Sequence, residues 1–216
     1  MGTCGRPSPA TEFELVRPVS SYGLSKLAAE KALAGANDRA MDLVILRIGN
    51  VFGPGSSFMI PSLAISLLRH DKYFRFFPCY KDQVFQLIYI DDVVEGIIKA
   101  VEGGHVAGTY ILAGDEPMTA EGIMRMISEV LSIEFKLEPG GSWQHDYLRF
   151  RTRILRMISR ADFLTFLMAG SELGPRRTFL IAKAKKGLGF SPRVSLRQGT
   201  AMTLDWAREN MLNERR

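Results

Sequence analysis

Short apolar runs that alternate with helix-forming segments constrain most strongly what this chain can fold into. The runs occupy residues 43–48, 85–90 and 109–113. Each has the length and the apolar character of a strand buried on both faces of a parallel sheet. The segments around them are rich in Ala, Leu, Glu, Lys and Ile, which favour helix when they recur at helical spacing. The alternation predicts an α/β fold with a mainly parallel sheet.

The expected helices have recognisable ends. Polar residues that can cap a helix N-terminus stand before several of them, and proline and glycine mark other boundaries. A helix over residues 22–33 is expected to have Ser20 or Ser21 as its N-cap and Gly35 at its end, and Pro61 is expected at the first position of the next helix. Asp91 or Asp92 is expected to cap a helix through Val101, and Thr119 a helix that ends near Leu131. A capping box of Ser195 and Gln198 is expected before a last helix through Trp206.

Composition narrows the class of protein. A chain of 216 residues, with 46% hydrophobic and 24% charged residues, is long enough for one domain, or one domain with a small appendage. It is neither a disordered nor a coiled-coil composition. Two cysteines, Cys4 and Cys79, make neither a disulfide framework nor a four-cysteine zinc site, so we expect no metal and a reduced, cytoplasmic setting. Glycine and proline interrupt the longest uncharged stretch, residues 48–68, so we expect no transmembrane segment.

Basic residues are concentrated near the C-terminal end. Residues 149–200 contain twelve Lys/Arg against two acidic residues, Asp162 and Glu172. Such a balance suits an anionic partner, for example a diphosphate ligand or a membrane surface, although a solvated basic face explains it equally well. Residues 147–167 mix arginines with large apolar residues, as a helix over a pocket, a membrane surface or the core would. No nucleic-acid-binding motif accompanies the charge, so we expect no nucleic-acid partner.

Tyr22 and Lys26 form the first candidate for chemistry. They stand at i and i+4 of the first expected helix, so their side chains share one face. A lysine ammonium beside a tyrosine hydroxyl stabilises the phenolate, and such a tyrosine can pass a proton to or from an alcohol or carbonyl. The same spacing also occurs by chance in ordinary surface pairs, so its surroundings decide its meaning.

Three motifs occur in order along the chain: Pro18-Val-Ser-Ser-Tyr22-Gly-Leu-Ser-Lys26-Leu-Ala-Ala-Glu30, then Leu46-Arg-Ile-Gly-Asn50-Val-Phe-Gly-Pro-Gly55, then Ile88-Tyr-Ile-Asp-Asp92-Val-Val-Glu-Gly96. Together they resemble the extended short-chain dehydrogenase/reductase family, the NAD-dependent epimerase/dehydratases. The stretch Lys183-Ala-Lys-Lys-Gly-Leu-Gly-Phe-Ser-Pro192 is similar to the C-terminal end of that family. The resemblance implies the C-terminal part of a Rossmann-type parallel sheet, with a small, mostly helical substrate-binding domain.

The resemblance also implies site residues. Tyr22 matches the catalytic acid/base, and Lys26 matches its partner, which also binds the nicotinamide ribose of NAD or NADP. Gly49 matches the position beside the nicotinamide, and Asn50 matches a residue that contacts the substrate. Each has a simpler reading, since Gly49 and Asn50 both suit a turn. Asp92 matches an aspartate typical of the family, and we expect it to cap a helix rather than to catalyse.

The chain departs from the family at its N-terminal end. No glycine-rich turn of the kind that binds a dinucleotide pyrophosphate occurs between a strand and a helix. We therefore expect the N-terminal part of the Rossmann-type domain to be absent. The remaining part of the NAD(P)-binding domain is expected at residues 1–114, with residues 50–84 on the substrate side, and the C-terminal substrate-binding region at residues 115–216.

The expected function is NAD(P)-dependent redox chemistry at a secondary alcohol or ketone. The resemblance implies a small, anionic nucleotide sugar as substrate, and it leaves a homodimer open. Phe85 stands where sugar-nucleotide members often carry an arginine for the diphosphate, although Arg176, Arg177 or Arg193 can replace it. The run Phe85-Gln-Leu-Ile-Tyr89 also resembles dehydrogenases and reductases of hydrophobic alcohols, which are the alternative. A catalytically inactive binding module is the rival outside the enzymes.

Overall fold

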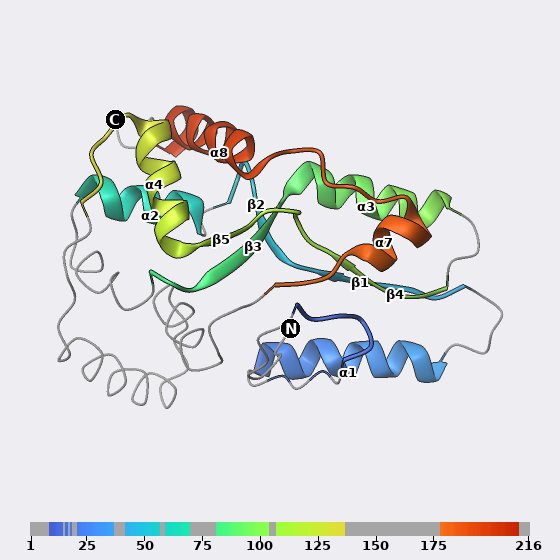
Figure 1. The fold of residues 1–216 in the computed structure, drawn as a ribbon. Coiled ribbons are helices and arrows are strands. Elements are labelled where there is room, and N and C mark those ends of the chain that lie inside the picture. The colour runs from blue at the N-terminus through green and yellow to red at the C-terminus, as the bar shows by residue number, and fades with distance from the viewer. Residues whose placement is uncertain are drawn as a thin grey trace.

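A computed structural model describes residues 9–14, 16, 18, 21–36, 42–56, 59–69, 81–103, 107–136 and 178–211. Its elements, in chain order, are α1 (Ser21–Ala36), β1 (Val44–Ile48), β2 (Asn50–Phe52), α2 (Ile60–Arg69), β3 (Val84–Tyr89), α3 (Ile90–Glu102), β4 (Gly108–Leu112), β5 (Pro117–Thr119), α4 (Ala120–Leu131), α7 (Ala182–Leu188) and α8 (Leu196–Met211) (Figure 1). The predicted α/β fold is confirmed. The expected helix within residues 147–167 lies outside the described residues, as do Cys4, Cys79, Arg176 and Arg177.

Parallel pairing joins the strands that the apolar runs predicted. β1 pairs with β4, with Val44 opposite Gly108 and Ile48 opposite Leu112. β2 pairs with β3 in parallel, and β5 adds to β3 in the antiparallel direction. Only Gly49 separates β1 from β2, so one nearly continuous strand takes part in both sheets. β5 was not predicted, because three residues that begin with proline carry no strand pattern.

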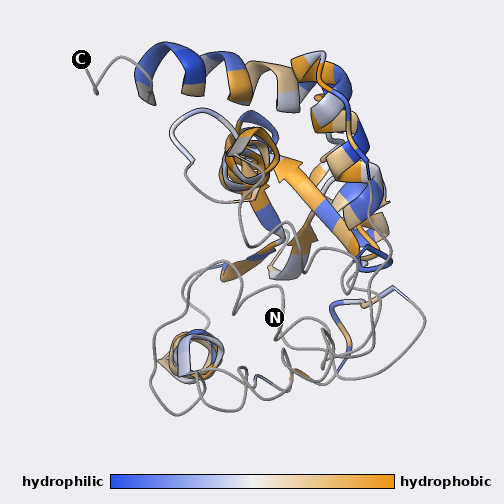
Figure 2. Ribbon diagram, turned by 90° about the vertical axis from the view of Figure 1, so that its left-hand side faces the viewer, coloured by the Kyte–Doolittle hydropathy of each residue, from blue (hydrophilic) through white to orange (hydrophobic). Residues whose placement is uncertain are grey.

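Two hydrophobic cores flank this twisted set of strands. One joins α2, α4 and α8 to β2 and β3, around buried side chains such as Phe52, Ile60 and Ile123. The other joins β4, α3 and α7, around residues such as Ile111 and Phe190. Helix α1 lies on one side of β1 and β4, and α3 lies on the other (Figure 1). In the view from the side, hydrophobic colouring is strong on a central strand, and α8 carries both hydrophilic and hydrophobic residues (Figure 2). The proposed division of the chain at residue 114 stays a prediction.

Two of the expected N-caps are confirmed, and three other expected helix ends are wrong. Pro61 is the second residue of α2 rather than its first, because the helix begins at Ile60, and Ser20 lies outside the described residues. The Thr119 hydroxyl accepts a hydrogen bond from the Gly122 N–H at 3.0 Å, and the Ser195 hydroxyl accepts one from the Gln198 N–H at 3.1 Å. Gly35 does not end α1, which continues to Ala36. Neither Asp91 nor Asp92 caps α3. That helix begins at Ile90, so its N-cap position is Tyr89, two residues before Asp91, and the Tyr89 side chain makes no capping bond.

Asp92 has a different structural role. Its side chain is buried, and its two carboxylate oxygens accept hydrogen bonds from the Arg193 N–H at 2.8 Å and the Val194 N–H at 3.2 Å. These bonds hold the backbone that leads into α8 against the first turn of α3. These contacts give Asp92 a structural role. The backbone N–H groups that it satisfies are about 100 residues away in the sequence, and they do not belong to the end of its own helix.

Candidate functional site

Tyr22 and Lys26 lie together on the exposed side of α1. The Lys26 Nζ is 5.3 Å from the centroid of the Tyr22 ring, which places the ammonium over the ring face. The Tyr22 side chain is 70% exposed, and none of the residues of α1 is buried. Within the part of the chain that the structure describes, Lys26 makes no ion pair. The ammonium and the phenol are therefore neighbours, and both are accessible to a ligand.

A partly buried ion pair attaches this helix to the sheet. The Arg47 guanidinium, on β1, binds the Glu30 carboxylate of α1 through two bonds, Nε to Oε1 at 3.1 Å and NH2 to Oε2 at 2.7 Å. Arg47 also donates to the Glu12 carbonyl oxygen at 3.3 Å. Two parallel N–H···O bonds fix orientation as well as distance. Arg47 thus sets where α1, and with it Tyr22, lies relative to β1.

Gly49 and Asn50 mark the carboxyl end of β1, the end at which open α/β sheets bind ligands. The Gly49 N–H donates to the Leu112 carbonyl oxygen at 2.8 Å. A Cβ at Gly49 would lie 3.4 Å from both the Ala113 Cβ and that oxygen, which is ordinary van der Waals contact, so packing between described residues does not by itself require a glycine here. Asn50 is half-buried and opens β2 opposite Leu87. No hydrogen bond between described residues links either position to Tyr22 or Lys26, so their shared site stays a prediction.

The neighbourhood of the expected diphosphate arginine is apolar. Phe85 is buried in the core that α2, α4 and α8 share with β3. Arg193, one of the proposed replacements, forms an ion pair with Glu95 on α3, with 3.0 Å between NH2 and Oε1. Glu95 also binds Lys99 at 3.0 Å. The Arg193 head group is thus engaged on the outside of α3.

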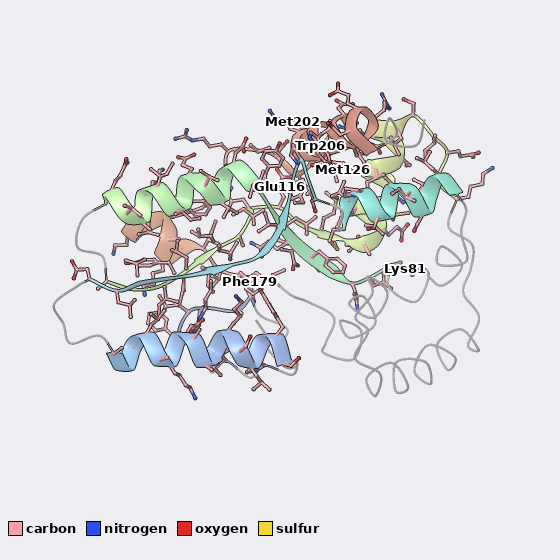
Figure 3. The ribbon with its side chains drawn as sticks, turned by 180° about the vertical axis from the view of Figure 1, so that it is seen from behind. Lys81, Glu116, Met126, Phe179, Met202 and Trp206 are labelled. Carbon is pink, nitrogen blue, oxygen red and sulfur yellow. The ribbon has the colours of Figure 1, made fainter. Side chains whose placement is uncertain are left out.

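Gln86 is a buried positioning residue that the sequence analysis missed. Its Nε2 donates to the carbonyl oxygens of Gly114 at 2.5 Å and Phe179 at 3.2 Å, and its Oε1 accepts from the Phe179 N–H at 2.6 Å. The side chain therefore satisfies the backbone of Phe179, which Figure 3 labels, as a neighbouring strand would. The only signal in the sequence was an amide within an apolar run.

Two further observations bear on ligand classes. Across the described ranges, no group of three or more His, Cys, Asp or Glu side chains is arranged to hold a metal ion. Of the described helices, none is both long enough and apolar enough to cross a membrane.

Comparison with known proteins identifies the family. The family model described as "NAD dependent epimerase/dehydratase family" matches residues 2–113. Among curated relatives, the decarboxylating sterol-4-alpha-carboxylate 3-dehydrogenase of Candida albicans is 25% identical, with 89% of this chain and 58% of that protein covered. The UDP-glucuronate 4-epimerase of Thermodesulfobacterium geofontis is 24% identical, with 93% and 54% covered.

The solved structures agree on the fold. UDP-glucuronic acid 4-epimerase from Bacillus cereus, in complex with NAD, superposes with a TM-score of 0.69 at 20% identity, covering 95% of this chain and 57% of the other. The chain thus spans a little over half the length of the relatives it matches. The motifs around Tyr22 and Asn50 fall within the matched family region, and the resemblance drawn from them is confirmed. The chain belongs to the NAD-dependent epimerase/dehydratase family.

Proposed function

We propose that this chain carries the acid–base half of an NAD-dependent reaction at a secondary alcohol or ketone. The observation that supports it is the Tyr22–Lys26 pair, with the ammonium 5.3 Å from the ring centroid on an exposed helix face. The Tyr22 hydroxyl gives a proton to the substrate oxygen or takes it away. The Lys26 charge stabilises the phenolate left when Tyr22 donates its proton.

The residues present fit a nicotinamide cofactor. Lys26 has three N–H donors and no carboxylate partner among the described residues, so it is free to bind ribose hydroxyls. Gly49 leaves no side chain at the carboxyl end of β1, where a flat ring needs room. When bound, the cofactor supplies or accepts the hydride. We propose NAD, as the family name indicates, and keep NADP as the alternative for this chain; a cytoplasmic setting stays a prediction.

Two substrate classes remain, and each has support. A nucleotide sugar is the first, because the UDP-glucuronate 4-epimerase and the human dTDP-D-glucose 4,6-dehydratase are among the relatives. A hydrophobic secondary alcohol is the second. Phe85, where an arginine would bind a diphosphate, lies in an apolar core, and sterol dehydrogenases of Candida albicans and Saccharomyces cerevisiae are also relatives.

Cofactor turnover distinguishes these candidates. The chain, reconstituted with the N-terminal half of a relative that supplies the glycine-rich turn, is incubated with NAD or NADP and with UDP-glucuronate, dTDP-glucose or a 3β-hydroxysterol. Formation of reduced nicotinamide, and product analysis by mass spectrometry for reactions without net redox change, report turnover. Tyr22→Phe keeps the aromatic ring, and we expect it to lower turnover about 10²–10⁴-fold, the usual share of general acid–base catalysis. Lys26→Met should weaken cofactor binding as well, since Lys26 is assigned to both tasks.

Lys31→Met is the matched control, because Lys31 is also an exposed lysine of α1. It should leave turnover and cofactor affinity unchanged. Full turnover by Tyr22→Phe would remove the proposed role of the phenol. Binding of cofactor without turnover of either substrate class would instead support the inactive binding module.

A further inference from the structure

Helix α1 lies beside the sheet with a charged residue in its contact face. None of its residues is buried, whereas helices in globular proteins normally owe most of their stability to a packed apolar face. Gly23, Leu27 and Glu30 are half-buried, and the other residues of the helix are exposed. Their spacing marks the side that faces β1 and β4 (Figure 1). The position of α1 therefore depends strongly on what Glu30 binds.

The partner of Glu30 is Arg47, which projects from β1 to the same side. Val44 and Leu46 pack into the core that β4 shares with α3 and α7, and side chains alternate along a strand, so Arg47 points towards α1. All three nitrogens of its guanidinium are bound. Nε and NH2 donate to the Glu30 carboxylate, and NH1 donates to the Glu12 carbonyl oxygen. A planar group held at three nitrogens fixes the direction of Glu30 as well as its distance.

Glu12 extends the contact to the second strand. Arg47 stands opposite Ile111 of β4 in the parallel register. The Ile111 N–H donates to the Glu12 carboxylate at 3.0 Å, while the Glu12 carbonyl oxygen accepts from Arg47 at 3.3 Å. The side chain of Glu12 thus binds β4, and its main chain binds the side chain from β1. The guanidinium is consequently located relative to both strands.

The distance from this anchor to the phenol makes the orientation of α1 important. Tyr22 precedes Glu30 by two helical turns, which corresponds to about 12 Å along the helix axis and about 80° around it. A tilt of about 10° at Glu30 would therefore move Tyr22 by about 2 Å. Lys26 belongs to the same helix and would move with it. A tilt leaves the Tyr22–Lys26 pair intact and changes only its place relative to the sheet.

The strand that holds α1 also carries the position assigned to the cofactor. Arg47 is two residues before Gly49, which the family resemblance places beside the nicotinamide. A general acid must come within hydrogen-bond reach of the atom that takes its proton. A misplacement of about 1 Å can lower a rate about 10²-fold. The Arg47–Glu30 contact thus connects the two places that the reaction must bring together.

We propose that Arg47 is a positioning residue for the reaction: through Glu30 it holds the Tyr22 phenol at a fixed place relative to the carboxyl end of β1. This inference rests on the proposed acid–base role of Tyr22. Glu12 fixes Arg47 in turn. The requirement is for the forked guanidinium rather than for a positive charge, because a lysine at this position supplies a point charge without two parallel bonds.

The first test measures the position of α1 in the chain alone. The two native cysteines are replaced by serine, and spin labels are attached at Ala28 of α1 and Val101 of α3. Both positions are exposed, and the two helices lie on opposite sides of β1 (Figure 1). Pulsed electron paramagnetic resonance then gives the distribution of distances between the labels across the sheet.

Arg47→Gln and Arg47→Lys should each shift or broaden this distribution by about 2 Å or more. Arg125→Gln is the matched control, because Arg125 on α4 also binds a carboxylate through two nitrogens, with Glu121 at 3.0 and 2.7 Å. It should leave the distribution unchanged. An unchanged distribution in both Arg47 variants would overturn the proposal, whatever the turnover.

The second test measures turnover in the reconstituted enzyme, with UDP-glucuronate or the 3β-hydroxysterol as substrate. Arg47→Gln should lower kcat about 10²-fold and leave KM within about twofold, since the contact acts on the phenol and not on substrate binding. Arg47→Lys should lower kcat about tenfold or more although its melting temperature falls by no more than about 2 °C, because a partly exposed ion pair contributes little to stability. Arg125→Gln should keep the full kcat.

A double variant separates one shared contact from two independent roles. Arg47→Gln combined with Glu30→Gln should lose no more turnover than the more affected single variant, because each change removes the same contact. Losses that multiply would overturn the proposal. Full kcat in Arg47→Gln, in an enzyme that Tyr22→Phe inactivates, would also overturn it and leave the proposed function standing. Full kcat in Tyr22→Phe would instead overturn the proposed function, and this inference with it.

Discussion

Removal of the Asp92 carboxylate should release the backbone that leads into α8. Asp92 is 3% exposed and is the acceptor for two N–H groups, those of Arg193 and Val194, at 2.8 and 3.2 Å. In Asp92→Ala both donors lose a charged acceptor in a place that water reaches poorly. A hydrogen bond to a charged group contributes about 1.5–3 kcal/mol to stability, and the longer bond contributes at the low end.

These values predict a loss of about 3 kcal/mol in the free energy of unfolding for Asp92→Ala. For a chain of this size the melting temperature then falls by about 6–12 °C. Asp92→Asn keeps the shape of the side chain and one acceptor oxygen, but its NH2 group would face one of the two backbone N–H donors. We therefore expect about half of the loss in the free energy of unfolding. Asp91→Ala removes an exposed carboxylate from the same helix turn, and we expect it to cost only about 0.3–1 kcal/mol through the helix dipole.

Urea denaturation followed by circular dichroism measures all three variants, provided that the slope against urea stays constant. The order should be Asp92→Ala, then Asp92→Asn, then Asp91→Ala, from most to least destabilised. Equal losses for Asp92→Ala and Asp91→Ala would refute the reasoning, because the two buried N–H bonds would then contribute nothing beyond the dipole.

Two other perturbations follow from the structure. A Cβ at Gly114 would lie 2.1 Å from the Leu87 carbonyl oxygen, so Gly114→Ala should lower the free energy of unfolding by about 3 kcal/mol. A Cβ at Gly35, inside α1, would meet no atom within 4 Å, so Gly35→Ala should raise it by about 0.5–1 kcal/mol. Urea denaturation compares the two variants, and equal stabilities would contradict the packing argument. Burial, and secondarily the charge of Asp91, raises the pKa of Tyr89. Above pH about 10 the folded chain therefore keeps the Tyr89 hydroxyl proton, whereas the unfolded chain loses it. The free energy of unfolding should consequently fall as the pH rises above about 10. Tyr89→Phe should fall less steeply, and parallel curves in denaturation measured against pH would exclude the effect.

Local patterns predicted the elements that depend on nearby residues. The apolar runs became β1, β3 and β4, and the hydroxyls of Thr119 and Ser195 cap the helices that follow them, because the donor in each case is three residues away. The Tyr22/Lys26 pair is likewise local, since helical geometry alone places the two side chains together. Its catalytic role stays a prediction.

Long-range partners explain what was missed. The sequence predicts a helix cap at Asp92 because only its position before a helix is visible locally. The N–H groups that donate to its carboxylate, those of Arg193 and Val194, are about 100 positions away. Gln86 looked like an exception in an apolar strand, although it satisfies the backbone of Phe179. No spacing rule within one element connects such positions, since the tertiary fold alone brings them together.

The same distant bonds determine when this chain can become stable during synthesis. Glu12 binds the Ile111 N–H, Gln86 binds Phe179, and Asp92 binds Arg193, so each bond joins residues more than 90 positions apart. A ribosome must therefore synthesise the chain as far as Arg193 before all of these groups find their partners. Until then the apolar strands are exposed, and loop closure over such distances makes folding slow. Synthesis of this protein should accordingly depend on chaperones that hold the nascent chain until α8 has emerged.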